Sequence, residues 1–288
     1  MEDGRNGKSE LGQFIPLHYH YNMLQDKERM ERFKAAIEQM VKPGDKVLEL
    51  GGGTGVLSFF AAQKAAKVLT VEYNIELVNE AKRILANNPN GDKIEVYHAD
   101  ASEFVPDSPV DVVVCEMLHV GLLREKQTEV IGKFKENYAK KHGGRMPFFI
   151  PFATLNAVQP VQQDFSFTGY YAPVLLFQDP YSIQERTVEL GNPALFHQLV
   201  YDEPYGGSAS FNGKLEITAS GRLNALRIIT KSILAVSEGG QTDWHSQYLI
   251  LPLENPLDVA PGQEVSASFS YELGGELAPL KPQVREAR

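Results

Sequence analysis

The chain of 288 residues has one cysteine, no long apolar run and no excess of basic side chains. A single cysteine, Cys115, cannot form an intramolecular disulfide, so we expect a reducing compartment, the cytoplasm. No apolar run approaches the ~20 residues that a membrane-spanning helix needs, and the first residues lack the apolar core of a signal peptide. We therefore expect a soluble protein without a membrane partner.

The charge balance points away from nucleic acid. Lysine and arginine number 28 against 37 acidic residues, which gives a net charge of −9. Nonspecific binding to phosphates needs a basic surface, so a cationic or neutral substrate is favoured. A protein with a net negative charge can still carry a local basic patch, so RNA is a less favoured substrate but is not excluded. His18, His20 and His119 show no metal-ligand spacing, and we predict no metal site.

In the first half of the chain, strand-like and helix-like segments alternate. An amphipathic helix is predicted from Asp26 to Met40, before Pro43. The segments that follow are Val47–Leu50, Leu57–Ala65, Val68–Glu72, Ile75–Asn87, Ile94–His98, Val110–Cys115 and Gln127–Tyr138. This alternation predicts a parallel sheet flanked by helices.

In the second half the apolar period becomes two. The stretch from Val265 to Tyr271 alternates throughout, and we predict further strands at Lys214–Ala219, Leu226–Val236 and Gln247–Leu251. The change of pattern predicts two domains, residues 1–148 and 149–288. Between the predicted strands, residues 172–205 are proline-rich and we expect an irregular or partly helical insertion. We expect no regular structure in residues 1–12 or from Pro279 onward.

A glycine-rich turn follows the first predicted strand. It reads Glu49-Leu-Gly51-Gly-Gly53-Thr-Gly55, and the next strand ends on Glu72. Glycines let the backbone turn tightly beside a nucleoside, and an acid at the next strand end can accept both ribose hydroxyls. Dinucleotide enzymes need a third glycine or alanine where Val56 stands. Glu49 suits an ammonium-bearing cofactor, so we predict an S-adenosylmethionine site; a turn without a ligand is the alternative.

Two glutamates follow the fourth predicted strand. Glu116 stands at its carboxyl end and should therefore point toward the cofactor, and Glu125 lies beyond the next loop. A pair of carboxylates can hold a guanidinium by charge-assisted hydrogen bonds. The alternative is a local cap or salt bridge for Glu116 and a solvated helix position for Glu125.

The two glutamates and the flanking glycine resemble the double-glutamate loop of the protein arginine methyltransferases. The N-terminal helix also resembles that family at His20, Met23, Leu24, Asp26 and Arg29, and the resemblance covers roughly residues 14–272. It implies that Arg29 pairs with the cofactor's carboxylate and that Met23 packs where the acceptor meets the methyl donor. It also implies that Asp100 and Ala101 clamp the adenine.

The resemblance implies a head-to-tail homodimer as well. The candidate dimerisation arm is the segment from Phe165 to Tyr205, which contains a run of apolar side chains at Tyr170, Tyr171, Val174, Leu175, Leu176 and Phe177. Such a run is difficult to hide in a monomer. Internal core is the alternative.

The sequence departs from the family pattern in three places, at four positions. The loop Thr242-Asp243-Trp244 has aspartate where the family has histidine, so Asp243 would face Asp26 and one of the two pKa values would rise. Cys115 and Met117 replace a serine and a tryptophan around Glu116. Phe14 replaces a tyrosine.

We predict an α/β protein with a Rossmann-like class I methyltransferase domain followed by an antiparallel β-barrel-like domain. The predicted activity is S-adenosylmethionine-dependent N-methylation of arginine, in a peptide or protein, or of a small guanidine or amine. Glu116 and Glu125 would hold the cation, with Trp244 as an aromatic wall and Asp243 beside it. The alternatives are a small-molecule or RNA methyltransferase and a catalytically silent partner-binding protein.

Overall fold

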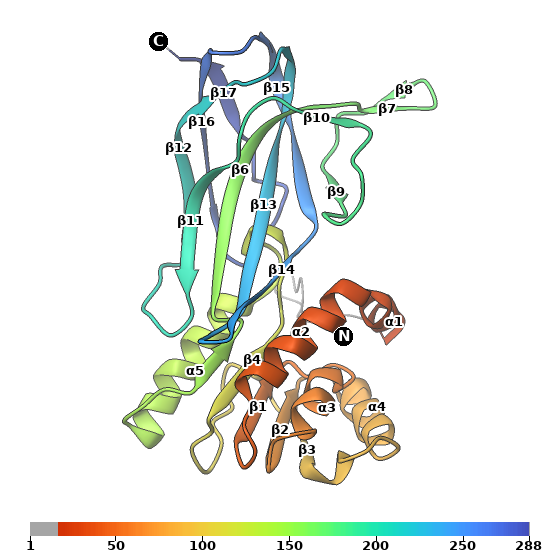
Figure 1. Cartoon of the computed structure of the whole chain (residues 1–288), viewed down its shortest axis with the longest axis vertical. Coiled ribbons are helices and arrows are strands. Elements are labelled where there is room, and N and C mark those ends of the chain that lie inside the picture. Colours follow the sequence, from red (N-terminus) through yellow and green to blue (C-terminus); the bar gives the residue numbers. More distant parts are fainter. Residues whose placement is uncertain (1–16, 288) are drawn as a thin grey trace, which may run out of the picture.

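The first half of the chain forms a five-stranded parallel sheet in the computed structural model, which describes residues 17–287 (Figure 1). The strand order is β3-β2-β1-β4-β5 and every neighbouring pair is parallel. The central strands are apolar because helices cover the sheet. The bounds are β1 Lys46–Leu50, β2 Lys67–Glu72, β3 Ile94–His98, β4 Val112–Cys115 and β5 Phe148–Ile150.

The helices agree closely with the sequence pattern. Their bounds are α1 Leu17–Gln25, α2 Lys27–Met40, α3 Val56–Ala62, α4 Ile75–Leu85 and α5 Gln127–His142, with 3₁₀ turns η1 Gly91–Lys93 and η2 Val120–Leu122. Asp26 caps α2 by accepting a hydrogen bond from the Arg29 amide at 3.0 Å. Phe33 and Ile37 on the apolar stripe of α2 are fully buried. No helix in residues 17–287 is both long and apolar enough to cross a bilayer.

The second half consists of antiparallel strands. The largest sheet has the order β10-β6-β13-β15-β9, with β11 on β6 and β14 on β13, and β12-β16-β17 form a second sheet. The bounds are β6 Ala153–Gln163, β7 Ser166–Phe167, β8 Tyr170–Tyr171, β9 Leu176–Gln178, β10 Thr187–Glu189, β11 Ala194–Val200, β12 Ser208–Glu216, β13 Gly221–Ser237, β14 Gly240–His245, β15 Tyr248–Val259, β16 Glu264–Glu272 and β17 Gln283–Glu286. The predicted fold class is confirmed.

Two segments differ from expectation. Residues 172–205 contain β9, β10 and β11 and no helix, and β11 pairs along β6 with a register shift between Leu195 and His197. The shift breaks the apolar alternation that would have revealed a strand. Residues 283–286 form β17 against β16, although this edge strand is mostly exposed. Backbone pairing rather than side-chain burial holds it.

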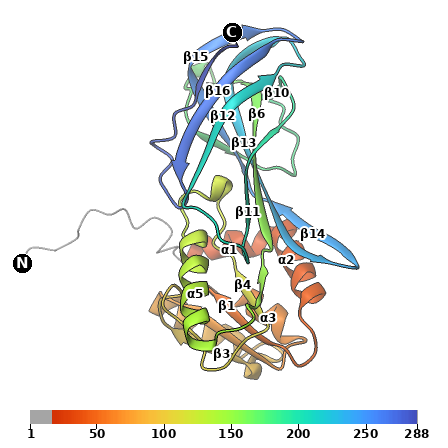
Figure 2. The same cartoon turned by 90° about the vertical axis from the view of Figure 1, so that its left-hand side faces the viewer.

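The two halves share a core. The β13–β14 hairpin runs down beside α2 (Figures 1 and 2), where Gln39 Nε2 donates to Ser237 Oγ at 2.7 Å and to the Gly240 carbonyl at 2.8 Å. Trp244 of β14 packs in the same apolar cluster as Phe33. The division into residues 1–148 and 149–288 stays a prediction. The shared core implies that the halves pack as a unit.

Candidate functional site

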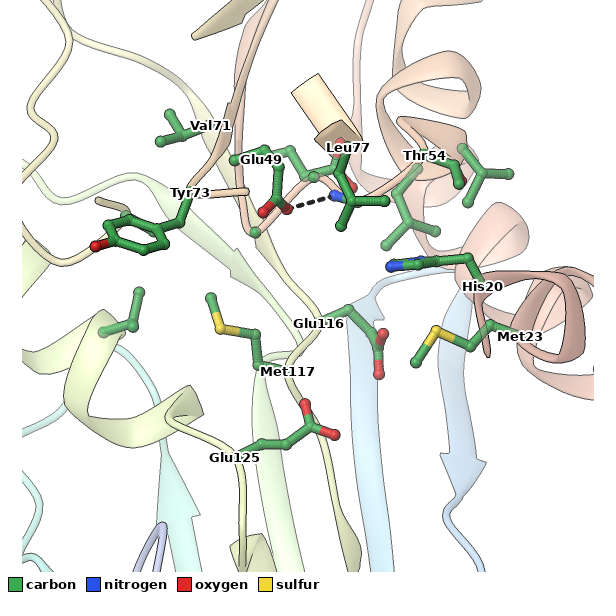
Figure 3. Close-up of a pocket in the computed structure, with 18 of the residues that line it drawn as sticks. His20, Met23, Glu49, Thr54, Val71, Tyr73, Leu77, Glu116, Met117 and Glu125 are labelled. Carbon is green, nitrogen blue, oxygen red and sulfur yellow. Dashed lines mark hydrogen bonds between the residues drawn. The ribbon is translucent and has the colours of Figure 1, made fainter. Parts of the chain in front are cut away.

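A cavity opens at the carboxyl ends of the parallel strands, between the glycine turn, helices α1 and α2 and the loop after β4 (Figure 3). This is the edge at which open α/β sheets bind ligands. Ten predicted site residues line it: Met23, Arg29, Glu49, Gly51, Gly53, Glu72, Asp100, Ala101, Glu116 and Glu125. The structure thus brings together most of the residues chosen from sequence.

The glycine turn follows β1 and needs glycine for local reasons. Gly51, Gly53 and Gly55 have φ values of +79°, +53° and +82°, a region that other residues rarely adopt. Gly55 lies outside the cavity lining and begins α3. Gly52 was not predicted as a site residue, yet it lines the cavity, and a Cβ there would lie 2.0 Å from Thr70 Oγ1. The turn therefore presents bare backbone to the cavity.

Glu49 is buried beneath the turn. Its Oε2 accepts hydrogen bonds from the Ser58 amide at 3.1 Å, from Thr70 Oγ1 at 3.1 Å and from the Ser58 hydroxyl. Burial raises the pKa of Glu49 to about 7, although the hydrogen bonds from Ser58 and Thr70 oppose that rise. A cationic group in the cavity would stabilise its ionised form.

Glu72 and Asp100 stand at the ends of two neighbouring strands. Glu72 Oε2 accepts from the Gly53 amide at 2.9 Å and Oε1 accepts from the Asn74 amide at 2.8 Å. These bonds fix the carboxylate while each oxygen keeps a lone pair for a hydroxyl donor. Asp100 Oδ1 accepts from the Ser102 amide at 2.8 Å. Both acids fit the nucleoside roles predicted for them.

Arg29 and Glu116 form an ion pair inside the cavity. An Arg29 guanidinium nitrogen donates to Glu116 Oε2, and the two side chains are 14 % and 9 % exposed. Burial opposes the charge of Arg29, but Glu116 outweighs it and the pKa of Arg29 is raised. Burial also raises the pKa of Glu116, against the effect of Arg29. Glu116 Oε1 is buried and has no hydrogen-bond partner within residues 17–287.

Glu125 faces Glu116 across the cavity (Figure 3). Burial raises the pKa of Glu125 to about 7, and the charge of Glu116 contributes to the rise while Arg29 and Arg124 oppose it. Both buried carboxylates therefore depend on the charge of Arg29, and Arg124 also acts on Glu125. The site has an excess of negative charge when both are ionised, which favours binding a second cation.

Trp244 and Asp243 do not line the cavity. Trp244 lies edge-on to Phe33 with ring centroids 6.0 Å apart, and the Arg29 guanidinium carbon lies 5.8 Å from its ring centre. Trp244 thus lies beside Arg29 and outside the cavity lining. Its role as an aromatic wall beside the acceptor stays a prediction.

The expected pairing of Asp243 with Asp26 is not found. Asp243 forms an ion pair with Lys231 at 2.8 Å, whereas Asp26 caps α2. Burial alone would raise the pKa of Asp243, but the hydrogen bonds from Lys231 and Gln241 lower it. The expectation that Asp243 faces Asp26 is therefore wrong, because sequence spacing could not reveal Lys231 on the adjacent strand. Phe14 lies outside the described residues.

Sequence reasoning missed Gln127 at the start of α5. Its buried carboxamide accepts from the Met117 amide at 2.8 Å and donates to the Cys115 carbonyl at 2.7 Å. It therefore holds the backbone on both sides of Glu116. Nothing in the local sequence distinguishes it from a solvated helix glutamine. Within the described chain, no three His, Cys, Asp or Glu side chains are grouped to hold a metal ion.

Comparisons with known proteins show what this chain is similar to. Residues 47–141 match the family model of a methyltransferase domain. The chain is 30 % identical over 270 residues to an uncharacterized protein of Methanothermobacter thermautotrophicus, covering 92 % of this chain and 97 % of that one. It is 31 % identical over 134 residues to an arginine N(omega)-methyltransferase of Streptomyces achromogenes, covering 45 % and 37 % of the two chains.

A solved structure shares the whole architecture. A chain of the Trypanosoma brucei PRMT1 enzyme–prozyme heterotetrameric complex with AdoHcy superposes with a TM-score of 0.73 at 17 % identity. The match covers 95 % of this chain and 99 % of that one. At this identity the likeness concerns the fold, and it extends through both halves of the molecule.

Proposed function

We propose that the methyl acceptor of this protein is a guanidinium group. The premise is that the chain belongs to a family of S-adenosylmethionine-dependent methyltransferases built like the protein arginine methyltransferases. The acceptor is arginine in a peptide or protein, or a small guanidine. Glu116 and Glu125 hold its positive charge, and one of its nitrogens receives the methyl group.

One observation carries this proposal. Among residues 17–287, Glu116 Oε1 is buried and makes no hydrogen bond, and a second buried carboxylate, that of Glu125, lies beside it. An unpaired buried carboxylate oxygen is costly unless a donor reaches it. Glu116 already accepts a hydrogen bond from one guanidinium, that of Arg29, on its other oxygen. A planar guanidinium from an acceptor fits the remaining oxygen and Glu125, because it carries several donors in a fixed fork.

The chain's own residues supply orientation and charge. When bound, S-adenosylmethionine supplies an electrophilic methyl group; Glu72 and Asp100 are placed to hold its nucleoside, and Arg29 to hold its carboxylate. Glu116 and Glu125 orient the guanidinium and draw its positive charge away from the nitrogen that reacts. A carboxylate close to the acceptor then receives the proton that the methylated nitrogen loses. Glu125, with a pKa near 7, suits that role.

Binding of matched peptides tests the acceptor class. We expect an arginine peptide to bind the protein in the presence of S-adenosylhomocysteine at least about 100-fold more tightly than the same peptide with citrulline, because citrulline keeps the shape but is neutral. Such a ratio corresponds to about 2.7 kcal/mol. Isothermal titration measures both affinities. Equal affinities would contradict the role of the carboxylates, and a small guanidine that binds more tightly than the peptide would identify a metabolite acceptor.

The pH dependence follows from Glu125. Its carboxylate must be ionised to hold a cation, so kcat/KM for the acceptor, at saturating cofactor, should fall by up to tenfold per pH unit below about pH 7. A bound guanidinium favours the ionised form, so the corresponding fall in kcat should occur at lower pH. Initial rates from pH 5.5 to 8.5 measure both. A kcat/KM that is constant over this range would contradict the assignment.

Stability should respond to pH in the opposite direction. The pKa of Glu125 is raised above its unfolded value of 4.5, so its contribution to folding is greatest below pH 4.5 and is lost as the pH rises through about 7. Glu49 behaves in the same way and has a pKa of about 7 as well. The Glu125→Gln variant separates the two, because it removes only the acceptor-side titration.

The dimer is a second part of the proposal. The arm exposes Tyr170, Val174 and Ile183, of which Ile183 is 90 % exposed, and the β7–β8 hairpin projects from the barrel (Figure 1). Exposed apolar side chains in one projecting segment favour association. We expect a light-scattering mass of two chains at micromolar concentration, and the mass of one chain would remove this part. The cytoplasmic location rests on the single cysteine, Cys115.

A further inference from the structure

Gln127 holds the strand end from which Glu116 projects. It is 1 % exposed, and its two polar atoms bind the two residues on either side of Glu116. Its Nε2 donates to the Cys115 carbonyl at 2.7 Å, and its Oε1 accepts from the Met117 amide at 2.8 Å. An amide side chain provides one donor and one acceptor together, so it can satisfy both backbone groups as a neighbouring strand would.

The carboxamide is itself held from the other half of the molecule. The Tyr201 hydroxyl, which is fully buried, lies near the Gln127 side chain and 3.0 Å from Thr154 Oγ1 on β6. A second contact ties the same loop to the barrel, because the Gly121 amide donates to Thr230 Oγ1 at 2.6 Å. The barrel therefore contacts this loop at Gly121 and approaches the Gln127 side chain that holds the strand end before it.

Burial of the Glu116 carboxylate costs free energy. Its carboxylate is buried and its pKa is raised, so rotation toward solvent would relieve the cost of burial. Residues after Cys115 have left the parallel sheet and lack neighbouring-strand hydrogen bonds. At this point the Gln127 side chain supplies the two backbone hydrogen bonds that a neighbouring strand would otherwise make. Without it, the Cys115 carbonyl and the Met117 amide would be unpaired in a buried site.

We propose that Gln127 is the positioning residue for Glu116 and sets the rate of methyl transfer through the placement of that carboxylate. This inference rests on the proposed function, because it concerns the same guanidinium clamp. Gln127 does not line the cavity. It acts by fixing the backbone of residues 115–117, and Tyr201 fixes its orientation.

Leucine and glutamate variants test this role. Gln127→Leu should lower kcat about 100-fold while the Kd for S-adenosylmethionine stays within about threefold, because the cofactor contacts lie elsewhere. Gln127→Glu should depend on pH. A protonated carboxyl can donate to the Cys115 carbonyl and accept from the Met117 amide, whereas a carboxylate cannot donate. We expect its kcat relative to wild type to lie within threefold of 1 at pH 6 and below about 1/30 at pH 8.5.

Gln159→Leu is the matched control. Gln159 is also 1 % exposed and donates to the Gly191 carbonyl at 2.8 Å, but it lies in the barrel away from the cavity. We expect it to lower thermal stability with kcat unchanged. If Gln127→Leu behaves like Gln159→Leu, or if the relative activity of Gln127→Glu is independent of pH, Gln127 is only a structural residue.

A measurement without turnover separates this inference from the proposed function. Hydrogen exchange of the Met117 amide should be slow in wild type and in Gln159→Leu, and at least about tenfold faster in Gln127→Leu. Should the wild type methylate no guanidine, the proposed function fails while the exchange result still decides whether Gln127 holds the loop. Unchanged exchange at Met117 would overturn the positioning role.

Discussion

Replacing Glu116 by glutamine should lower kcat/KM for a guanidine acceptor about 1000-fold, a loss of about 4 kcal/mol of transition-state stabilisation. Glutamine keeps the size of the side chain and one acceptor oxygen, but it removes the charge that pairs with two guanidinium groups. One is that of Arg29, which donates to Glu116 Oε2. The other is the acceptor, which we place on Oε1, an oxygen that makes no hydrogen bond within residues 17–287. Steady-state rates over a range of arginine-peptide concentrations, at saturating S-adenosylmethionine, measure the loss.

Glu129→Gln is the control for this substitution. Glu129 lies on α5 and forms an exposed pair with Lys133 at 2.9 Å, one turn along the helix. Such pairs contribute little, so activity should remain within about twofold of wild type. Glu125→Gln should resemble Glu116→Gln in direction. Turnover by Glu116→Gln within tenfold of wild type would mean that the acceptor is not held as a cation.

Replacing Arg29 by alanine should raise the Kd for S-adenosylmethionine about 100-fold, which corresponds to about 2.7 kcal/mol. The loss has two parts. The cofactor's carboxylate loses its predicted partner. Glu116 loses the only cation that forms an ion pair with it among residues 17–287, and Glu125 loses a positive charge that lowers its pKa. Removing one partner of a buried charge pair leaves the other charge uncompensated. We expect a further rise in the pKa of Glu116 as it takes up a proton.

Arg32→Ala separates this effect from the loss of any positive charge on α2. Arg32 lies about one turn after Arg29, and its exposed side chain is 3.7 Å from Glu28. Calorimetry should give a Kd for the cofactor within about twofold of wild type. If Arg32→Ala and Arg29→Ala weaken binding equally, the effect is general electrostatics, and the contact assigned to Arg29 is wrong.

The site residues that could be predicted from the sequence are those whose position requires a particular backbone conformation or lies at the end of a strand. Gly51 and Gly53 stand where φ is positive, and Glu72 and Glu116 stand at strand ends, so residue type and position are both constrained. Gln127 could not be found in this way. Its partners are main-chain atoms ten and twelve residues earlier, and their pairing depends on how α5 packs on β4.

The fold was predictable to the same degree. The central strands β1 and β4 are largely apolar runs, and α2 shows a clear apolar stripe, so these could be placed within a few residues. β11 and β17 could not, because one has a register shift and the other is a largely exposed edge. Asp243 shows the same limit at the level of one side chain, since its partner Lys231 belongs to a different strand.

The position of the transferred methyl group tests the central claim most directly. The protein would be incubated with methyl-labelled S-adenosylmethionine and an arginine peptide, free arginine or RNA, with Glu116→Gln in parallel, and the products analysed by tandem mass spectrometry. We predict label on a guanidino nitrogen, absent with Glu116→Gln. Label on a ribonucleotide or on an amine, undiminished in that variant, would contradict the guanidinium clamp.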